Sequence, residues 1–258
     1  MRKHIKLPAP ELSQLKEVNI ELDMSARHYA QLATCEGQVP EDVAISILKD
    51  LMEEDAGKLT MEEVRYLFML VKINSLENDY EVTVSCTHEK KGGKEGEECG
   101  CLNTVKIRLS DADLNPTPKG YKVPEIEFCT EDSEKTYLVM PPTADMESAL
   151  WNWYLTTKNK KMDDLVEDKK TSTEYTFLRG CLHLVDKKTG ERLMQQFNDF
   201  DYALKWLDCN KFKTVHKLYE LILEVSQFGV QNKVYETKCK ECGGTLVFRL
   251  PLLDGVVD

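Results

Sequence analysis

Two segments of the chain share one pattern of hydrophobic positions. Residues 64–75 (VRYLFMLVKINS) and 215–226 (VHKLYELILEVS) carry apolar side chains at the spacing i, i+3, i+6 and i+7, which falls on one face of an α-helix. Thr60 and Glu63 form a T-x-x-E capping box just before the first segment. The pattern predicts an amphipathic helix in each half of the chain.

A strand pattern that ends in a cysteine follows each of these helices. Residues 79–86 (DYEVTVSC) alternate apolar and polar positions up to Cys86, and residues 232–239 (NKVYETKC) lead in the same way to Cys239. Alternation with a period of two is typical of a half-buried strand. Each half is therefore expected to contain a helix followed by a strand that delivers a cysteine.

A second cysteine and a second strand complete the pattern. Residues 101–110 (CLNTVKIRLS) align with residues 242–251 (CGGTLVFRLP), which pairs Cys101 with Cys242. The recurrence of the same order in both halves predicts an α+β fold of two related repeats, each a helical segment followed by a cysteine-knuckle β-hairpin of the zinc-ribbon type. In this alignment the first hairpin has twelve extra residues, within THEKKGGKEGEECG, between its two cysteines.

The repeat also predicts how the chain is divided. Residues 1–114 form the first repeat, with helices and an expanded cysteine-knuckle hairpin, and residues 126–258 form the second, which ends in a C-x-x-C hairpin. Residues 115–125 (NPTPKGYKVPE) contain three prolines and a glycine, as expected of a joint.

Patterning predicts several further elements within these repeats. Further helices are expected at 40–54 and 145–156, strands that follow prolines at 8–22 and 123–139, and an exposed connection at 157–173. Trp151, Trp153 and Trp206 are expected to pack in the core.

The four cysteines of the two hairpins fit the ligand requirements of zinc. Cys86, Cys101, Cys239 and Cys242 can supply four thiolates to one tetrahedral Zn²⁺, two from each turn. A site filled by protein on all four positions is structural, because catalysis needs an open position.

Two other interpretations of the cysteines stay open. Cys86, His88, Cys99 and Cys101 can form a local site in the first hairpin, or no metal binds at all. A redox role is disfavoured because a redox-active C-x-x-C opens a helix in a βαβ unit, whereas this one lies at a hairpin tip.

Composition excludes some classes of function. A net charge of −11 over 258 residues opposes nucleic-acid binding, which needs a concentrated basic face. No run approaches the roughly 18 apolar residues of a membrane span, and the N-terminus lacks the apolar stretch of a signal peptide. The motifs of zincins, α/β-hydrolases, P-loop proteins and dinucleotide-binding folds are absent from the sequence. Neither catalytic nor cofactor-binding residues are predicted beyond the structural metal site, and an enzyme is not expected.

Four segments together resemble a known family. The run LPAPEL, the helix and strand EEVRYLFMLVKINSLENDYEVTVSC, the strand CGCLNTVKIRLSDADL and the segment YETKCKECGGTLVFRLPLLD resemble the baseplate hub assembly proteins of T-even-like contractile-tailed bacteriophages. The chain departs from the family pattern at KINSLEND, where the family is more basic and contains glycine, and in the expanded loop before Cys99.

The resemblance implies a non-enzymatic role in building the phage tail. It implies tape-measure and baseplate hub proteins as partners, and action either as a virion component or as an assembly chaperone. The corresponding locations are the host cytoplasm during assembly and the virion tail or baseplate. The oligomeric state stays open. The alternative from another class is a zinc-ribbon adaptor that mediates regulatory protein–protein contacts.

Overall fold

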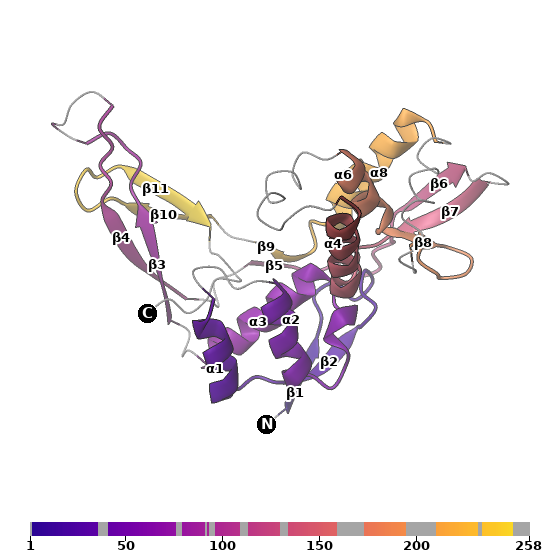
Figure 1. The fold of residues 1–258 in the computed structure, drawn as a ribbon, viewed down its shortest axis with the longest axis horizontal. Coiled ribbons are helices and arrows are strands. Elements are labelled where there is room, and N and C mark those ends of the chain that lie inside the picture. The colour runs from indigo at the N-terminus through magenta and orange to yellow at the C-terminus, as the bar shows by residue number, and fades with distance from the viewer. Residues whose placement is uncertain are drawn as a thin grey trace.

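A computed structural model describes most of the chain as a mixed α/β protein with small antiparallel sheets. The described residues are 2–35, 41–75, 79–90, 92, 96–108, 113–129, 134–158, 173–194, 210–231 and 234–249. Figure 1 shows three parts: an N-terminal lobe, a second lobe, and a pair of β-hairpins that projects from them.

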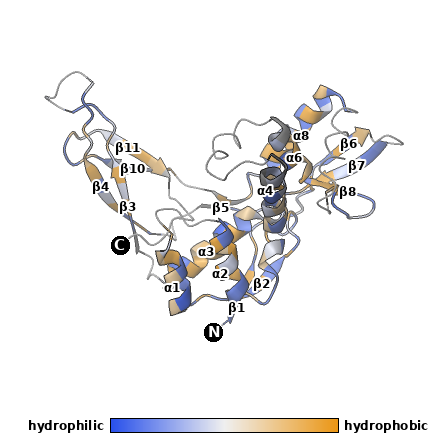
Figure 2. Cartoon of the chain, viewed as in Figure 1, coloured by the Kyte–Doolittle hydropathy of each residue, from blue (hydrophilic) through white to orange (hydrophobic). Residues whose placement is uncertain are grey.

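The N-terminal lobe packs three helices against a hairpin. Its elements are β1 (Arg2–Lys6), β2 (Glu17–Glu21), α1 (Ala26–Ala33), α2 (Glu41–Leu51), the 3-10 turn η1 (Ala56–Lys58) and α3 (Met61–Ser75). Strands β1 and β2 pair antiparallel, with Ile5 opposite Val18. Val18 and Ile20 from β2 pack with Ile47 of α2 and Leu67 of α3 in one buried cluster. Figure 2 shows hydrophobic residues running along α3, as the periodicity predicts.

The predicted capping box begins α3. The backbone N–H of Thr60 donates to Oε2 of Glu63 at 2.8 Å, and the N–H of Glu63 donates to Oγ1 of Thr60 at 3.3 Å. These bonds satisfy backbone groups that have no partner within the helix.

The second lobe is a three-stranded sheet covered by helices. It contains β6 (Glu125–Cys129), β7 (Glu134–Val139), α4 (Ala144–Lys158), α6 (Thr173–Cys181), β8 (Leu184–Asp186) and α8 (Phe212–Val225). The sheet order is β6-β7-β8, with both pairs antiparallel. Phe128 and Tyr137 from the sheet pack with Leu150 of α4 and Leu218 of α8.

Short bridges join the two lobes. Thr60 pairs with Thr143, and the N–H of Ala144 donates to the carbonyl of Leu59 at 2.7 Å. Strand β5 (Asp113–Asn115) pairs with β9 (Gly229–Gln231), so the end of the predicted first repeat contacts the predicted second repeat. The division at the proline-rich joint, residues 115–125, remains a prediction.

The two hairpins stand side by side away from the lobes (Figure 1). One is β3 (Asp79–Ser85) with β4 (Leu102–Arg108), and the other is β10 (Val234–Lys238) with β11 (Thr245–Arg249). Ile107 packs with Met69 of α3 and Val230 of β9, while Tyr235 and Phe248 border this cluster. The hairpin pair is thus anchored on the first lobe, although one hairpin comes from each half of the chain.

Most predicted elements agree with the structure. The helices expected at 40–54 and 145–156 are α2 and α4, and the strands expected after prolines are β2, β6 and β7. Trp151 and Trp153 border the core of the second lobe. Trp206 and almost all of the predicted connection 157–173 lie outside the described residues. Within the described part of the chain, none of the helices is long and apolar enough to cross a membrane.

Candidate metal centre

The two hairpins place their cysteines at equivalent turns. Cys86 directly follows β3, and Cys239 directly follows β10. Leading up to these cysteines, each strand alternates exposed and half-buried positions in the same phase. Val82 and Tyr235 each lie four residues before the first cysteine of their hairpin. The register pairs Val82 with Val105 and Tyr235 with Phe248.

Two backbone hydrogen bonds of the first turn have counterparts in the second. The N–H of Gly100 donates to the carbonyl of Cys86 at 3.0 Å, and the N–H of Gly243 donates to the carbonyl of Cys239 at 3.0 Å. Gly100 and Gly243 have φ values of 63° and 72°, in the left-handed region that glycine adopts without strain. The carbonyl of Cys101 accepts the N–H of Cys86 at 2.9 Å, and the carbonyl of Gly244 accepts the N–H of Cys239 at 2.9 Å.

These bonds correct the alignment of the two hairpins. The turn places Cys99 at the position of Cys242, and it places Cys101 at the position of Gly244. The strand registers agree, because they place Leu102 at the position of Thr245, where the sequence alignment placed Thr104. The sequence alignment paired Cys101 with Cys242 because the T-x-x-x-R-L letters match, whereas the backbone follows the E-C-G triplets 98–100 and 241–243.

Four thiols from the two turns meet at one point. The sulfur atoms of the group all lie within 4.8 Å of one another; its members are Cys86, Cys99, Cys239 and Cys242. Three of them are buried and Cys99 is half-buried. All four are free thiols.

The spacing of the sulfur atoms suits a tetrahedral ion. Sγ of Cys86 lies 3.5 Å from Sγ of Cys242, and Sγ of Cys99 lies 3.8 Å from Sγ of Cys239. A tetrahedron with Zn–S bonds of about 2.3 Å has edges of about 3.8 Å. Each of these contacts lies between the two hairpins, so the cluster brings together segments that are 140 or more residues apart in sequence.

The other predicted ligands lie around this group. Sγ of Cys101 donates to the carbonyl of Leu102 at 3.8 Å, and Cys101 is not a member of the four-thiol group. Nδ1 of His88 lies 3.6 Å from Sγ of Cys86. The His88 ring packs so closely on Gly244 that a Cβ there would lie 2.8 Å from His88 Cγ. The four-thiol group thus contains Cys99, which the sequence analysis gave as an alternative ligand, and His88 lies beside the group.

Asn103, which the sequence reading missed, holds the hairpins together beside the thiols. Its side chain is 2% exposed. Nδ2 donates to the carbonyl of Cys101 at 2.9 Å and lies 3.7 Å from Sγ of Cys239, while Oδ1 accepts the N–H of Lys240 at 2.9 Å. Asn103 thus bonds its own turn and the turn of the other hairpin.

Hydrogen bonds and burial shift the thiol pKa values in opposite directions. The backbone N–H of Cys242, assisted by that of Glu241, lowers the pKa of Cys239 to about 5. Burial raises the pKa of Cys86 to about 12. These hydrogen bonds therefore favour the thiolate form of Cys239, which is the form that binds metals.

The donor set and its surroundings define a class of site. Four thiols donated by two paired turns leave no position of a tetrahedral ion for water or substrate. The fold and the site thus describe a mixed α/β protein in which two hairpins bring four thiols together.

The comparisons with known proteins give the family. A family model described as T4 bacteriophage base plate protein matches residues 16–254, and the chain belongs to this family. The resemblance to T-even-like phage proteins is thereby confirmed at the level of a baseplate protein. No curated protein and no solved structure gives a significant match.

Proposed function

We propose that this protein is a non-enzymatic assembly factor of the phage tail, which acts on the baseplate hub together with the tape-measure protein. The observation that carries the proposal is the family match, which spans both lobes and both hairpins. Membership of a baseplate family indicates a structural or assembly role with other tail proteins as partners. The net charge of −11 suits an assembly role, because it keeps a complex with an aggregation-prone helical partner soluble.

The proposal includes an internal repeat. Helix α3 is followed by hairpin β3–β4, and helix α8 is followed by hairpin β10–β11 after the short strand β9. The two hairpins share two turn hydrogen bonds and the same burial phase before the first cysteine. These correspondences support two related zinc-ribbon-like units that face each other across the thiol cluster.

The proposal also includes one structural Zn²⁺ in the cluster. The ligands are Cys86, Cys99, Cys239 and Cys242, which differ from the set predicted by sequence in one member. Bound zinc supplies four bonds that hold the two hairpins together. The chain contributes the two left-handed glycine turns that aim the thiols, and Asn103, which fixes the spacing of the turns.

Mass spectrometry of infected cells tests the assembly role. The full chain, tagged and expressed during infection, is recovered from crude lysate, and purified virions are analysed in parallel. We expect recovery of the tape-measure protein and hub proteins from the lysate. Abundance in virions identifies a permanent tail component, whereas presence in the lysate alone identifies a chaperone that leaves the finished tail.

The same experiment tests the adaptor alternative. The hairpin pair projects from the lobes (Figure 1) and carries exposed apolar side chains at Leu102 and Val247, which suits a regulatory contact. Recovery of host transcription or signalling proteins without any tail protein would support the adaptor and contradict the assembly role.

A further inference from the structure

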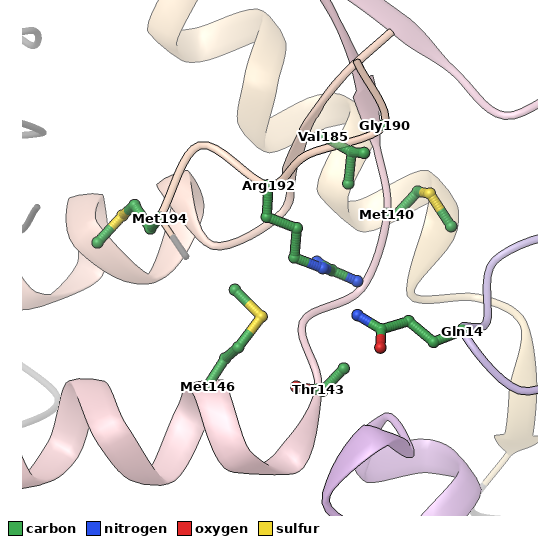
Figure 3. A pocket seen from close by; sticks show the side chains of 8 residues that line it. All are labelled: Gln14, Met140, Thr143, Met146, Val185, Gly190, Arg192 and Met194. Atoms are coloured by element: carbon green, nitrogen blue, oxygen red, sulfur yellow. The ribbon is translucent and has the colours of Figure 1, made fainter. Parts of the chain in front are cut away.

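A pocket of about 440 Å³ lies in the second lobe, close to its junction with the first. Its walls come from both lobes and are shown in Figure 3; the lining residues are Gln14, Met140, Thr143, Met146, Val185, Gly190, Arg192 and Met194. The volume falls in the range of about 300–1,000 Å³ typical of ligand sites. It lies in a different part of the molecule from the thiol cluster and shares no residue with it.

A tight turn after β8 places an arginine in this pocket. Oδ1 of Asp186 accepts the N–H groups of Lys188 and Thr189 at 2.8 and 3.1 Å, and Gly190 closes the turn with a φ of 73°. The chain then returns along β8, with Arg192 bridged to Val185. The turn therefore directs Arg192 back toward the junction of the lobes.

The guanidinium group of Arg192 is buried, and the described residues supply no counter-ion to it. The residue is 9% exposed. Its Nη1 and Nη2 atoms donate to the carbonyls of Leu182 and Pro141 at 3.0 and 2.8 Å, but its Nε has no hydrogen-bond partner. None of the ion pairs among the described residues involves Arg192.

Binding of an anion would stabilise the buried guanidinium group of Arg192. Burial lowers the pKa of Arg192 to about 10, so the guanidinium is still charged at neutral pH. A buried charge that is bonded only to neutral carbonyls, with one N–H unpaired, keeps much of its desolvation cost. A carboxylate is the partner that best matches the geometry of a guanidinium edge.

The rest of the pocket indicates what carries the carboxylate. Met140, Met146 and Met194 form flexible apolar walls, which adapt to apolar side chains of varied shape. Figure 3 shows the Met146 side chain pointing toward Arg192, with Gln14 and Thr143 on the other side of the guanidinium. A small inorganic anion would leave the methionine side chains without an apolar contact. A purely apolar ligand would leave the charge of Arg192 without an anionic partner.

We propose that this pocket binds a peptide segment of a partner protein in which an aspartate or glutamate stands beside apolar side chains. The carboxylate pairs with Arg192 and the apolar neighbours contact the three methionines. The proposal goes beyond the assembly role and does not depend on the metal, because the pocket and the thiol cluster share no residue.

A peptide titration followed by NMR tests the site directly. The probe is the capped peptide acetyl-Ala-Leu-Glu-Leu-Ala-amide, added to the full chain with ¹³C-labelled methionine methyl groups. We expect shifts of the Met140, Met146 and Met194 signals and none of Met69, which is buried under the hairpins. The matched peptide with Gln in place of Glu should bind at least about tenfold more weakly, because it loses a charge-assisted hydrogen bond.

A pair of variants on α4 separates binding from folding. Met146→Glu places a carboxylate beside Arg192 without touching its bonds to Leu182 and Pro141, and it should weaken binding of the Glu peptide at least about tenfold. Ser148→Glu adds the same charge at an exposed position of α4 and should leave binding unchanged. Unchanged signals of Met69 report that both variants are folded.

Three results would overturn the proposal. The first is the absence of any shift of the three methionines at millimolar peptide. The second is equal binding of the Glu and Gln peptides. The third is a shift of these signals by inorganic phosphate but not by the Glu peptide, which would make the pocket a site for a small free anion.

Discussion

The two units, each a helix and a hairpin, form the same turn although the loops between their two cysteines differ in length. Twelve residues separate Cys86 from Cys99, whereas two separate Cys239 from Cys242. The longer loop continues the hairpin, since Glu89 pairs with Glu98 and the N–H of Cys99 bonds the carbonyl of His88. Loop length adds little to the entropy of closure. The comparison teaches that the turn depends on the cysteines, the left-handed glycine and the strand register, while the connecting loop is free to vary.

The units also differ in how each is held in place. Helix α3 begins with the reciprocal bonds of Thr60 and Glu63, whereas Lys211 at the start of α8 makes no side-chain cap. At equivalent buried positions of the second strands, the first hairpin has Asn103 and the second has Leu246. These differences define substitutions that act on one unit and not on the other.

The largest effect is expected from the thiols themselves. Cys86→Ser should remove about one zinc per chain and lower the unfolding midpoint by about 10 °C, because the cross-link between the hairpins is lost. Metal analysis and calorimetry measure both. Cys101→Ser is the matched control, since the turn places Cys101 at the position of Gly244, and it should keep the metal.

Two outcomes would contradict this comparison of the thiols. Loss of metal from Cys101→Ser but not from Cys99→Ser would restore the ligand set predicted from sequence. Retention of metal in Cys86→Ser together with its loss in Cys239→Ser would show that the hairpins do not share one ion.

The capping box of α3 should make stability depend on pH. Burial raises the pKa of Glu63 from its ordinary value of 4.5 to about 7. The folded state thus keeps a proton that the unfolded state releases, and the resulting stabilisation is complete below pH 4.5 and is lost as the pH rises through 7. Glu63→Gln keeps an acceptor without the charge, and should be more stable than the wild type by about 2–3 kcal/mol at pH 8.

Urea unfolding between pH 5 and 8 measures this difference. The matched comparison is Thr60→Val, which removes the other half of the box but keeps the carboxyl group of Glu63, and it should cost about 1 kcal/mol while stability still depends on pH. Parallel pH profiles for Glu63→Gln and the wild type would show that Glu63 does not titrate in this range.

Asn103 should stabilise the hairpin pair by an intermediate amount. Asn103→Leu copies the residue of the second hairpin but leaves the N–H of Lys240 without its partner. It also removes one of the two hydrogen bonds that the carbonyl of Cys101 accepts, while the bond from the N–H of Cys86 remains. We expect a loss of about 1–2 kcal/mol, with the metal retained, because partly buried backbone groups lose a hydrogen bond. Chemical unfolding gives the energy, and faster hydrogen exchange at the Lys240 amide locates it. A variant as stable as the wild type would make Asn103 dispensable.

The smallest effect is expected at the start of α8. Lys211 has φ −71° and ψ 144°, a conformation suited to a capping side chain. Lys211→Asp supplies an acceptor for the first N–H groups and favours the positive end of the helix dipole, so the unfolding midpoint should rise by about 2–4 °C. Lys211→Ala is the control without an acceptor. A fall in the midpoint with Asp would mean that the lysine makes a contact worth more than a cap.

Much of the architecture could be predicted from sequence because local patterns encode it. The 3.6-residue periodicity located α3 and α8, and the T-x-x-E pattern located the start of α3. The choice between Cys99 and Cys101 could not be predicted in this way. They stand two residues apart, so both fit the same face of a strand. The matching threonine, arginine and leucine that follow them favoured an alignment that differs by two residues from the strand registers. The shared E-C-G triplets, 98–100 and 241–243, were the signal that could have decided it.

Other features depend on contacts that no local pattern reports. Asn103 is a polar residue within a strand, and only the approach of the second hairpin buries it. The pocket around Arg192 joins residues from Gln14 to Met194.

The cross-link between the hairpins has a consequence for synthesis of the chain. Cys99 and Cys239 are 140 residues apart, so at about 5–20 residues per second the first pair of thiols leaves the ribosome roughly 7–30 s before the second. During this interval the first hairpin can offer an ion only two of its four ligands. Closure of the cluster therefore occurs only after nearly the whole described chain has been made, and an ion held by all four thiols, as proposed, would mark a molecule whose translation has passed Cys242.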